Sequence, residues 1–159
     1  SHTATKNHFG VRYVPKGVIF NVEAPTLFRC NEWKYMLGLL NSGVAATILP
    51  IMNQTMHFLA GDTAKFPVIY DPNYVDEINA LVQENIELSM EDWDSQETSW
   101  GFKHNCLVRT GSVKLSDCIT NTINEINNRK EKILSNEKRL DEIYASIYGL
   151  TENDITEKT

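Results

Sequence analysis

A heptad pattern toward the C-terminal end constrains the fold most, because it assigns about four heptads of the chain to one long helix. Steps of four and three residues alternate through Ile119, Ile123, Ile126, Lys130, Ile133, Glu137, Leu140, Tyr144 and Ile147. We expect a helix from about Leu115 to Tyr148, ended by Gly149 and followed by a frayed tail. Because Lys130 and Glu137 interrupt the apolar stripe, we expect it to pack against this chain's own body or an antiparallel neighbour.

Two β-branched and aromatic runs near the N-terminus predict an antiparallel hairpin. The runs cover residues 11–14 and 18–22, and Pro15-Lys16-Gly17 between them is typical of a turn. Residues 56–59 and 66–69 are predicted to be short extended pieces around a Gly61-Asp62 turn. The N-terminal part therefore predicts a small β element.

Apolar spacing predicts two helices between these pieces and the long C-terminal helix. The first begins after Asn31 as N-cap and runs for about four turns, with Pro50 disfavouring helix at Leu49. The second runs from Pro72 to about Ser89, with Asp71 capping it and its acidic face in solvent. We therefore expect an α+β fold: a small antiparallel β element with two packed helices, then the long heptad-patterned helix.

The net charge of -6 conceals a segregation of charge along the chain. Residues 1–70 carry six Lys/Arg and three Asp/Glu, whereas residues 71–102 carry nine acids and no Lys or Arg. Residues 103–159 carry nine of each sign. A surface that approaches DNA phosphates should be locally positive, and only the first segment meets that condition.

An aromatic and acidic segment in the middle of the chain fits no amphipathic repeat. It reads Asp92-Trp93-Asp94-Ser95-Gln96-Glu97-Thr98-Ser99-Trp100-Gly101-Phe102 and is called here the signature segment. Trp93, Trp100 and Phe102 are expected to anchor an irregular segment onto the core, while Asp94 and neighbouring hydroxyls satisfy turn and cap hydrogen bonds. The alternative is that the segment is a docking surface.

The signature segment resembles Asp-Trp-Asp-Ser-x-Glu-Thr-Ser-Trp-Asp-Phe of the PglX-like adenine-specific DNA methyltransferases of bacterial phage-exclusion (BREX) systems, relatives of single-chain restriction-modification enzymes. Two further blocks, residues 39–68 and residues 139–150 with their Ile-Tyr-Gly-Leu close, resemble the same family in the same order. In that family the catalytic half carries an Asn-Pro-Pro-Tyr or Asp-Pro-Pro-Tyr motif and a Gly-rich loop for S-adenosylmethionine. Neither motif occurs here. The resemblance therefore implies a C-terminal fragment without catalytic residues or a cofactor of its own.

By the same resemblance, the intact enzyme methylates N6 of adenine in a specific DNA sequence, using S-adenosylmethionine. Residues 1–102 are expected to be the end of a target-recognition domain, and residues 103–159 a helical spacer ending in a frayed tail. The expected partners are double-stranded DNA, the missing methyltransferase half and other phage-defence proteins. The DNA-contact candidates come from the basic first segment: Lys6, Arg12, Lys16, Arg29 and Lys34.

Other chemistries find little support in the sequence. Glu91, Asp92, Asp94 and Glu97 could hold Mg²⁺, but no cation lies between Lys65 and Lys103 to stabilise a phosphoryl transition state. The three cysteines are irregularly spaced, which favours free thiols in a reducing compartment over a disulfide framework or a zinc site. No nucleophilic triad can be assembled. No apolar run approaches the ~20 residues of a membrane span, so we expect a cytoplasmic protein without a membrane partner.

A function from a different class stays open. The heptad helix could pair with another chain and make this region an interaction or oligomerisation module without direct DNA contact. Coverage of the heptad stripe separates the two hypotheses: a stripe covered within the monomer favours the spacer, and a stripe buried between two chains favours the module.

Overall fold

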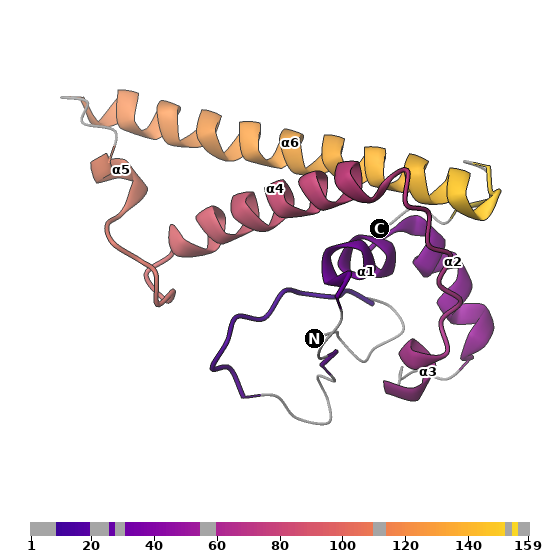
Figure 1. Cartoon of the computed structure of the whole chain (residues 1–159). Helices are drawn as coiled ribbons and strands as arrows, with labels where there is room; N and C mark the ends of the chain where they lie inside the picture. Colours follow the sequence, from indigo (N-terminus) through magenta and orange to yellow (C-terminus); the bar gives the residue numbers. More distant parts are fainter. Residues whose placement is uncertain are drawn as a thin grey trace. The chain divides into compact units, whose positions relative to one another are not determined.

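The computed structural model describes residues 9–19, 26–27, 31–54, 60–109, 114–151 and 154–155. The helices in these ranges, labelled in Figure 1, are α1 (Trp33–Leu40), α2 (Gly43–Met52), α3 (Ala60–Ala64), α4 (Val75–Asp94), α5 (Cys106–Arg109) and α6 (Leu115–Tyr148). The chain forms two compact units. Unit 1 contains Ser1–Val82 and Lys138–Thr159, and unit 2 contains Gln83–Glu137. The expected division into a recognition part (residues 1–102) and a spacer (residues 103–159) stays a prediction.

The expected α+β fold is wrong, because the described part of the chain contains helices and no strand. Residues 11–14 and 18–19 form no strand, with Val11 in an isolated β bridge, and residues 20–22 and 56–59 lie outside the described ranges. The Asn41 side chain supplies the hydrogen bonds that a neighbouring strand would give Val11: its Oδ1 accepts from the Val11 N–H at 2.9 Å, and its Nδ2 donates to the Val11 carbonyl at 2.8 Å. A turn does occur at Lys16 and Gly17, where Gly17 has a φ of 95°.

The first predicted helix is in fact two helices, α1 and α2, bent by 75° at their junction. Ser42, in an extended conformation, donates to the Leu39 carbonyl at 2.7 Å and accepts from the Ala45 N–H, so it ends one helix and caps the next. The Gly43 N–H donates to Asp141 Oδ1 at 2.8 Å. At the junction, one local side chain, Ser42, and one distant side chain, Asp141, thus take the place of helical bonds.

Two boundary predictions in this region are also wrong. Glu32, and not Asn31, is the N-cap of α1, without a side-chain cap bond. Pro50 lies inside α2, which continues to Met52. Proline removes one helical donor, but near the C-terminal end the loss is confined to a single bond, and the Asn53 N–H still reaches the Leu49 carbonyl at 3.0 Å.

α4 begins and ends later than the apolar spacing predicts. Asp71 does act as a cap, because its Oδ1 accepts from the Asn73 N–H at 2.9 Å, but this turn precedes the helix, which starts at Val75. The helix continues past Ser89 to Asp94 and so includes the start of the signature segment. Gly61 and Asp62, expected in a turn, lie in the short helix α3.

Unit 1 has an apolar core made by α1, α2 and the unit 1 portions of α4 and α6. Its fully buried large side chains are Tyr35, Leu39, Leu40, Val44, Leu49, Ile78, Ile143 and Tyr144. The rings of Tyr35 and Tyr144 meet edge to face with centroids 5.5 Å apart, and the Tyr144 hydroxyl donates to the Tyr35 carbonyl at 2.7 Å. A Cβ on Gly38 would lie 2.8 Å from that hydroxyl. The absence of a side chain at Gly38 therefore lets α1 lie this close to Tyr144.

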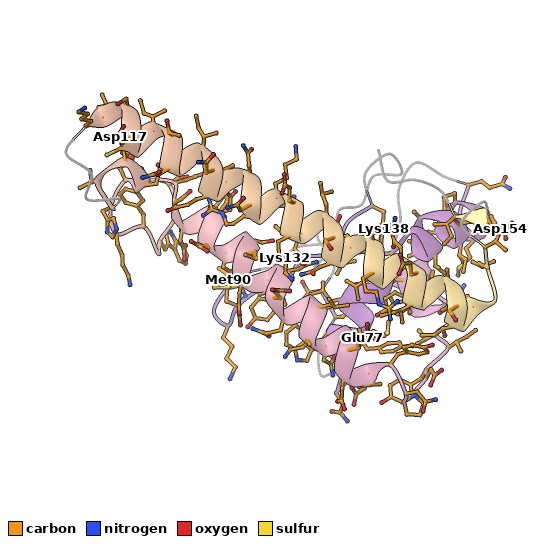
Figure 2. The ribbon with its side chains drawn as sticks, turned by 90° about the horizontal axis from the view of Figure 1, so that it is seen from above. Glu77, Met90, Asp117, Lys132, Lys138 and Asp154 are labelled. Atoms are coloured by element: carbon orange, nitrogen blue, oxygen red, sulfur yellow. The ribbon has the colours of Figure 1, made fainter. Side chains whose placement is uncertain are left out.

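Unit 2 is built on an antiparallel pair formed by the unit 2 portions of α4 and α6, side by side in Figures 1 and 2. Arg129 bonds Glu91 and Asp92 at 3.3 Å each, whereas Asn136, further along α6, bonds Glu84 at 2.7 Å. Ion pairs of Arg129 and hydrogen bonds of the Asn136 side-chain amide therefore form much of the contact between the two helices. The buried side chains of α6 in unit 2 are Cys118, Thr122 and Asn136.

The bounds of α6 agree with the prediction. The buried face of the helix matches the predicted heptad stripe only in unit 1. Leu140 and Tyr144 are buried as the heptad pattern predicts. In unit 2, by contrast, Ile119, Ile123 and Ile126 are 42%, 51% and 45% exposed. The face against α4 is offset by one residue, about 100° around the helix.

Among the described residues, no single helix has the length and apolar character to cross a membrane. The bent pair α1 and α2 meets the two criteria together, and its side chains supply much of the buried core of unit 1.

Candidate nucleic-acid interface

Three of the five predicted DNA-contact residues lie in the described part of unit 1. Arg12 and Lys16 are exposed in the segment of residues 9–19, and Lys34 is half-buried in the first turn of α1. Lys6 and Arg29 lie outside the described residues.

Two aromatic rings connect the N-terminal segment to the start of α1. The Tyr13 and Trp33 centroids are 5.2 Å apart, with the ring planes inclined by 30°. Lys34 Nζ lies 5.5 Å from the Trp33 centroid, within the range of a cation–π contact. Arg12 directly precedes Tyr13, just as Lys34 directly follows Trp33. Each of the two rings therefore has a cation next to it in the sequence. We call Arg12, Tyr13, Trp33 and Lys34 the cation–aromatic cluster.

Helix α1 fixes the N-terminal segment at two points. Asn41, its C-cap, holds both backbone polar groups of Val11, and Trp33 in its first turn contacts the Tyr13 ring. The cluster is therefore supported by a regular element, although half of it comes from an irregular segment. Lys16 follows in the turn that Gly17 closes.

The cluster combines the two kinds of group that contact nucleic acids. Tyr13 and Trp33 remain more than a third exposed, which leaves ring surface for stacking, and the cations can meet phosphates. A shallow depression of about 220 Å³ adjoins it, lined by Asn31, Glu32, Trp33, Lys34 and Asn79.

Sequence reasoning found the cations of this cluster and missed its aromatic rings. Tyr13 was assigned to a strand, and Trp33 to the apolar face of a helix. Arg12-Tyr13 and Trp33-Lys34 each place a cation directly beside an aromatic residue. That repeated pairing was the available signal.

The two tryptophans of the signature segment do not anchor it onto the core, so this part of the prediction is wrong. Trp93, in the last turn of α4, is 58% exposed, and Trp100 is 100% exposed. Phe102 is half-buried, Asp94 is half-buried, and Glu97 is exposed. Two of the hydroxyls beside Asp94 make turn bonds: the Ser99 hydroxyl donates to Asp94, and the Ser95 hydroxyl donates to the Asp92 carbonyl at 2.6 Å.

Three or more His, Cys, Asp or Glu side chains that could hold a metal ion do not come together in the described ranges. The marked pKa shifts belong to structural groups: burial raises the pKa of the hydroxyls of Tyr35, Tyr144 and Tyr148. Two of these hydroxyls hold the chain before α4, because Tyr35 donates to the Ile69 carbonyl at 2.8 Å and Tyr148 to the Pro67 carbonyl at 2.5 Å.

Comparison with curated proteins finds relatives across most of the chain. The adenine-specific methyltransferase BrxX of Escherichia coli O9:H4 (strain HS) is 32% identical over an alignment that covers 79% of this chain. The adenine-specific methyltransferase PglX of Lacticaseibacillus casei (strain Zhang) is 28% identical over 89% of it. The chain is a relative of the PglX-like methyltransferases. This confirms the resemblance seen in the signature segment and its neighbouring blocks.

The chain spans 12% of the length of each of these two relatives. Methyltransferases of this class generally use S-adenosylmethionine as methyl donor. No protein-family model matches the chain, and no solved structure matches it.

Proposed function

We propose that this chain is a DNA target-recognition and spacer region, without catalysis of its own, of a site-specific adenine-N6 DNA methyltransferase that serves phage defence or restriction-modification. The cation–aromatic cluster of unit 1 carries the proposal. Its residues lie in the one segment of the sequence with a clear excess of Lys and Arg. The similarity to two adenine-specific methyltransferases supports it.

A division of labour follows from the chemistry of adenine methylation. The target base must leave the duplex to enter a catalytic pocket, while other elements hold the flanking duplex in register. Exposed rings and cations of the cluster suit that second task. S-adenosylmethionine would bind the catalytic part of the same cytoplasmic enzyme, which is then a partner of this chain along with DNA.

The experiment compares DNA affinity at several salt concentrations for two triple variants with equal charge change. Arg12→Ala/Lys16→Ala/Lys34→Ala removes the described cationic candidates. Lys65→Ala/Lys103→Ala/Lys114→Ala removes three exposed cations outside the cluster. Fluorescence anisotropy with a labelled duplex should show weaker binding and a salt slope reduced by up to ~3 for the first variant only, if each cation meets one phosphate.

Equal losses in both triple variants would assign the binding to diffuse charge and would exclude the cluster as the DNA contact. A first variant with the wild-type slope would place the contact surface elsewhere on the molecule.

A second candidate function is supported by the exposed stripe of α6 in unit 2. Leu115, Ile119, Ile123 and Ile126 are exposed in the described structure, so this part of the stripe is available to a second copy of the chain. Sedimentation of wild type and Ile123→Glu/Ile126→Glu decides the point. An oligomerisation module predicts a wild-type dimer that the double variant dissociates, whereas the recognition and spacer function predicts monomers in both cases.

A further inference from the structure

Trp100 is fully exposed, although the loop around it is closely tied together. On its N-terminal side, the buried Ser99 donates its hydroxyl proton to the Asp94 carboxylate. On its C-terminal side, the Gly101 N–H donates to the Ser99 hydroxyl oxygen at 3.1 Å. The residues before and after Trp100 are thus connected through one hydroxyl to the end of α4.

Close packing adds to these hydrogen bonds. A Cβ on Gly101 would lie 2.5 Å from the carboxylate carbon of Asp94, so a larger residue at this position would require the Asp94 side chain to move. The polar residues of the signature segment therefore build a compact turn that presents the indole of Trp100 to solvent. An aromatic side chain of this size can bury roughly 150–250 Å² against a partner.

The charges around this loop select the partner. Within unit 2, residues 91–103 carry four acids and one lysine, and the exposed Glu97 and Lys103 lie three residues before and after Trp100. Within unit 2, Arg129 already bonds Glu91 and Asp92, so an arginine side chain suits this acidic stretch. A nucleic-acid backbone would be repelled here, whereas a guanidinium can stack on an indole face and pair with carboxylates.

We propose that Trp100, with the exposed Trp93 in the last turn of α4, is the docking anchor for a basic protein surface that supplies arginine side chains. The Asp94–Ser99–Gly101 turn positions the indole, and the exposed Glu97 of the signature segment provides the charge complement. This interaction lies in unit 2 and is separate from the DNA contact proposed for unit 1. Either can hold if the other fails.

The probe is a tetra-arginine peptide amide, titrated into the whole chain by calorimetry at low salt. Wild type should bind it saturably, and Trp100→Ala should weaken binding by about 2- to 30-fold, the range of a cation–π contact. Trp33→Ala is the matched control, because it removes an exposed indole from the basic segment, and it should leave the peptide affinity unchanged. Unchanged circular dichroism of Trp100→Ala, expected for an exposed side chain, shows that the variant folds.

Three results would overturn the proposal. One is the absence of saturable binding to wild type, and another is an equal loss in Trp100→Ala and Trp33→Ala. The third is concentration-dependent self-association of wild type that Trp100→Ala abolishes, since the occupant would then be a second copy of the chain.

Discussion

Unit 1 and unit 2 share the helices α4 and α6, yet each buries a different kind of side chain. In unit 1 the buried positions are mostly apolar, with Leu39, Val44 and Ile78 fully enclosed. In unit 2 the buried side chains of α6 are Cys118, Thr122 and Asn136, while Ile119, Ile123 and Ile126 of the same helix are exposed. The same helix therefore changes its pattern of burial between the two units.

This difference indicates what stabilises each unit. Burial of apolar area stabilises unit 1 from within. The paired helices of unit 2 instead hold polar groups in their contact, and two buried atoms there, Thr122 Oγ1 and Arg129 Nε, have no hydrogen-bond partner in the described structure. Such groups reduce stability. Unit 2 gains less from its own packing and keeps its apolar side chains available for contact with another surface.

Removing matched apolar side chains from the two units should give the largest contrast. Leu39→Ala, at a fully buried site in unit 1, should lower the free energy of unfolding by about 2–5 kcal/mol. Ile123→Ala, at the half-exposed stripe in unit 2, should change it by no more than about 0.5 kcal/mol. Urea melts of both variants measure the contrast, and equal losses would contradict the different burial of the two units.

Alkaline pH should weaken unit 1 through its buried tyrosines. Burial raises the pKa of the Tyr144 hydroxyl in the folded chain above the ordinary value of about 10. Its contribution is therefore complete below pH ~10 and is lost as pH rises toward the folded pKa, by up to about 1.4 kcal/mol per pH unit. Tyr144→Phe should cost about 1 kcal/mol at pH 7 through its lost hydrogen bond but should flatten this decline. A decline as steep as in wild type would exclude Tyr144 as its source.

A smaller effect of opposite sign is expected in the polar contact of unit 2. Thr122→Val removes a buried hydroxyl that has no described partner, so it should raise the free energy of unfolding by about 1 kcal/mol. Thr120→Val is the control, because the exposed Thr120 hydroxyl bonds the Ser116 carbonyl at 3.0 Å. Thermal melts should separate the two, and a destabilised Thr122→Val would mean that the hydroxyl is satisfied in solution.

The sequence predicted α6 well because a heptad pattern specifies a helix whatever its surroundings. It did not predict the packed face in unit 2, since Ile119, Ile123 and Ile126 have the spacing of a buried stripe and yet remain exposed. The usual assumption that an apolar stripe faces the chain's own core fails there.

The prediction of an N-terminal hairpin was wrong for a related reason. Residues 11–14 have strand-forming side chains, but the amide of Asn41, thirty residues away, satisfies the backbone of Val11. A long-range contact of one side chain is invisible to local patterns. The charged members of the candidate site could be predicted from charge segregation alone, whereas the contact of Tyr13 with Trp33 depends on how the segment meets α1.

The three tryptophans of the chain provide the most direct test of the central claim, that DNA contacts unit 1 through the cation–aromatic cluster. Trp33 lies in that cluster, and Trp93 and Trp100 lie in unit 2. Indole N–H resonances, assigned with single Trp→Phe variants, would be followed by NMR during titration with a DNA duplex at low and high salt. If DNA contacts the cluster, the Trp33 resonance should shift in a salt-sensitive way, and those of Trp93 and Trp100 should stay unchanged. Shifts confined to Trp93 and Trp100 would contradict this claim.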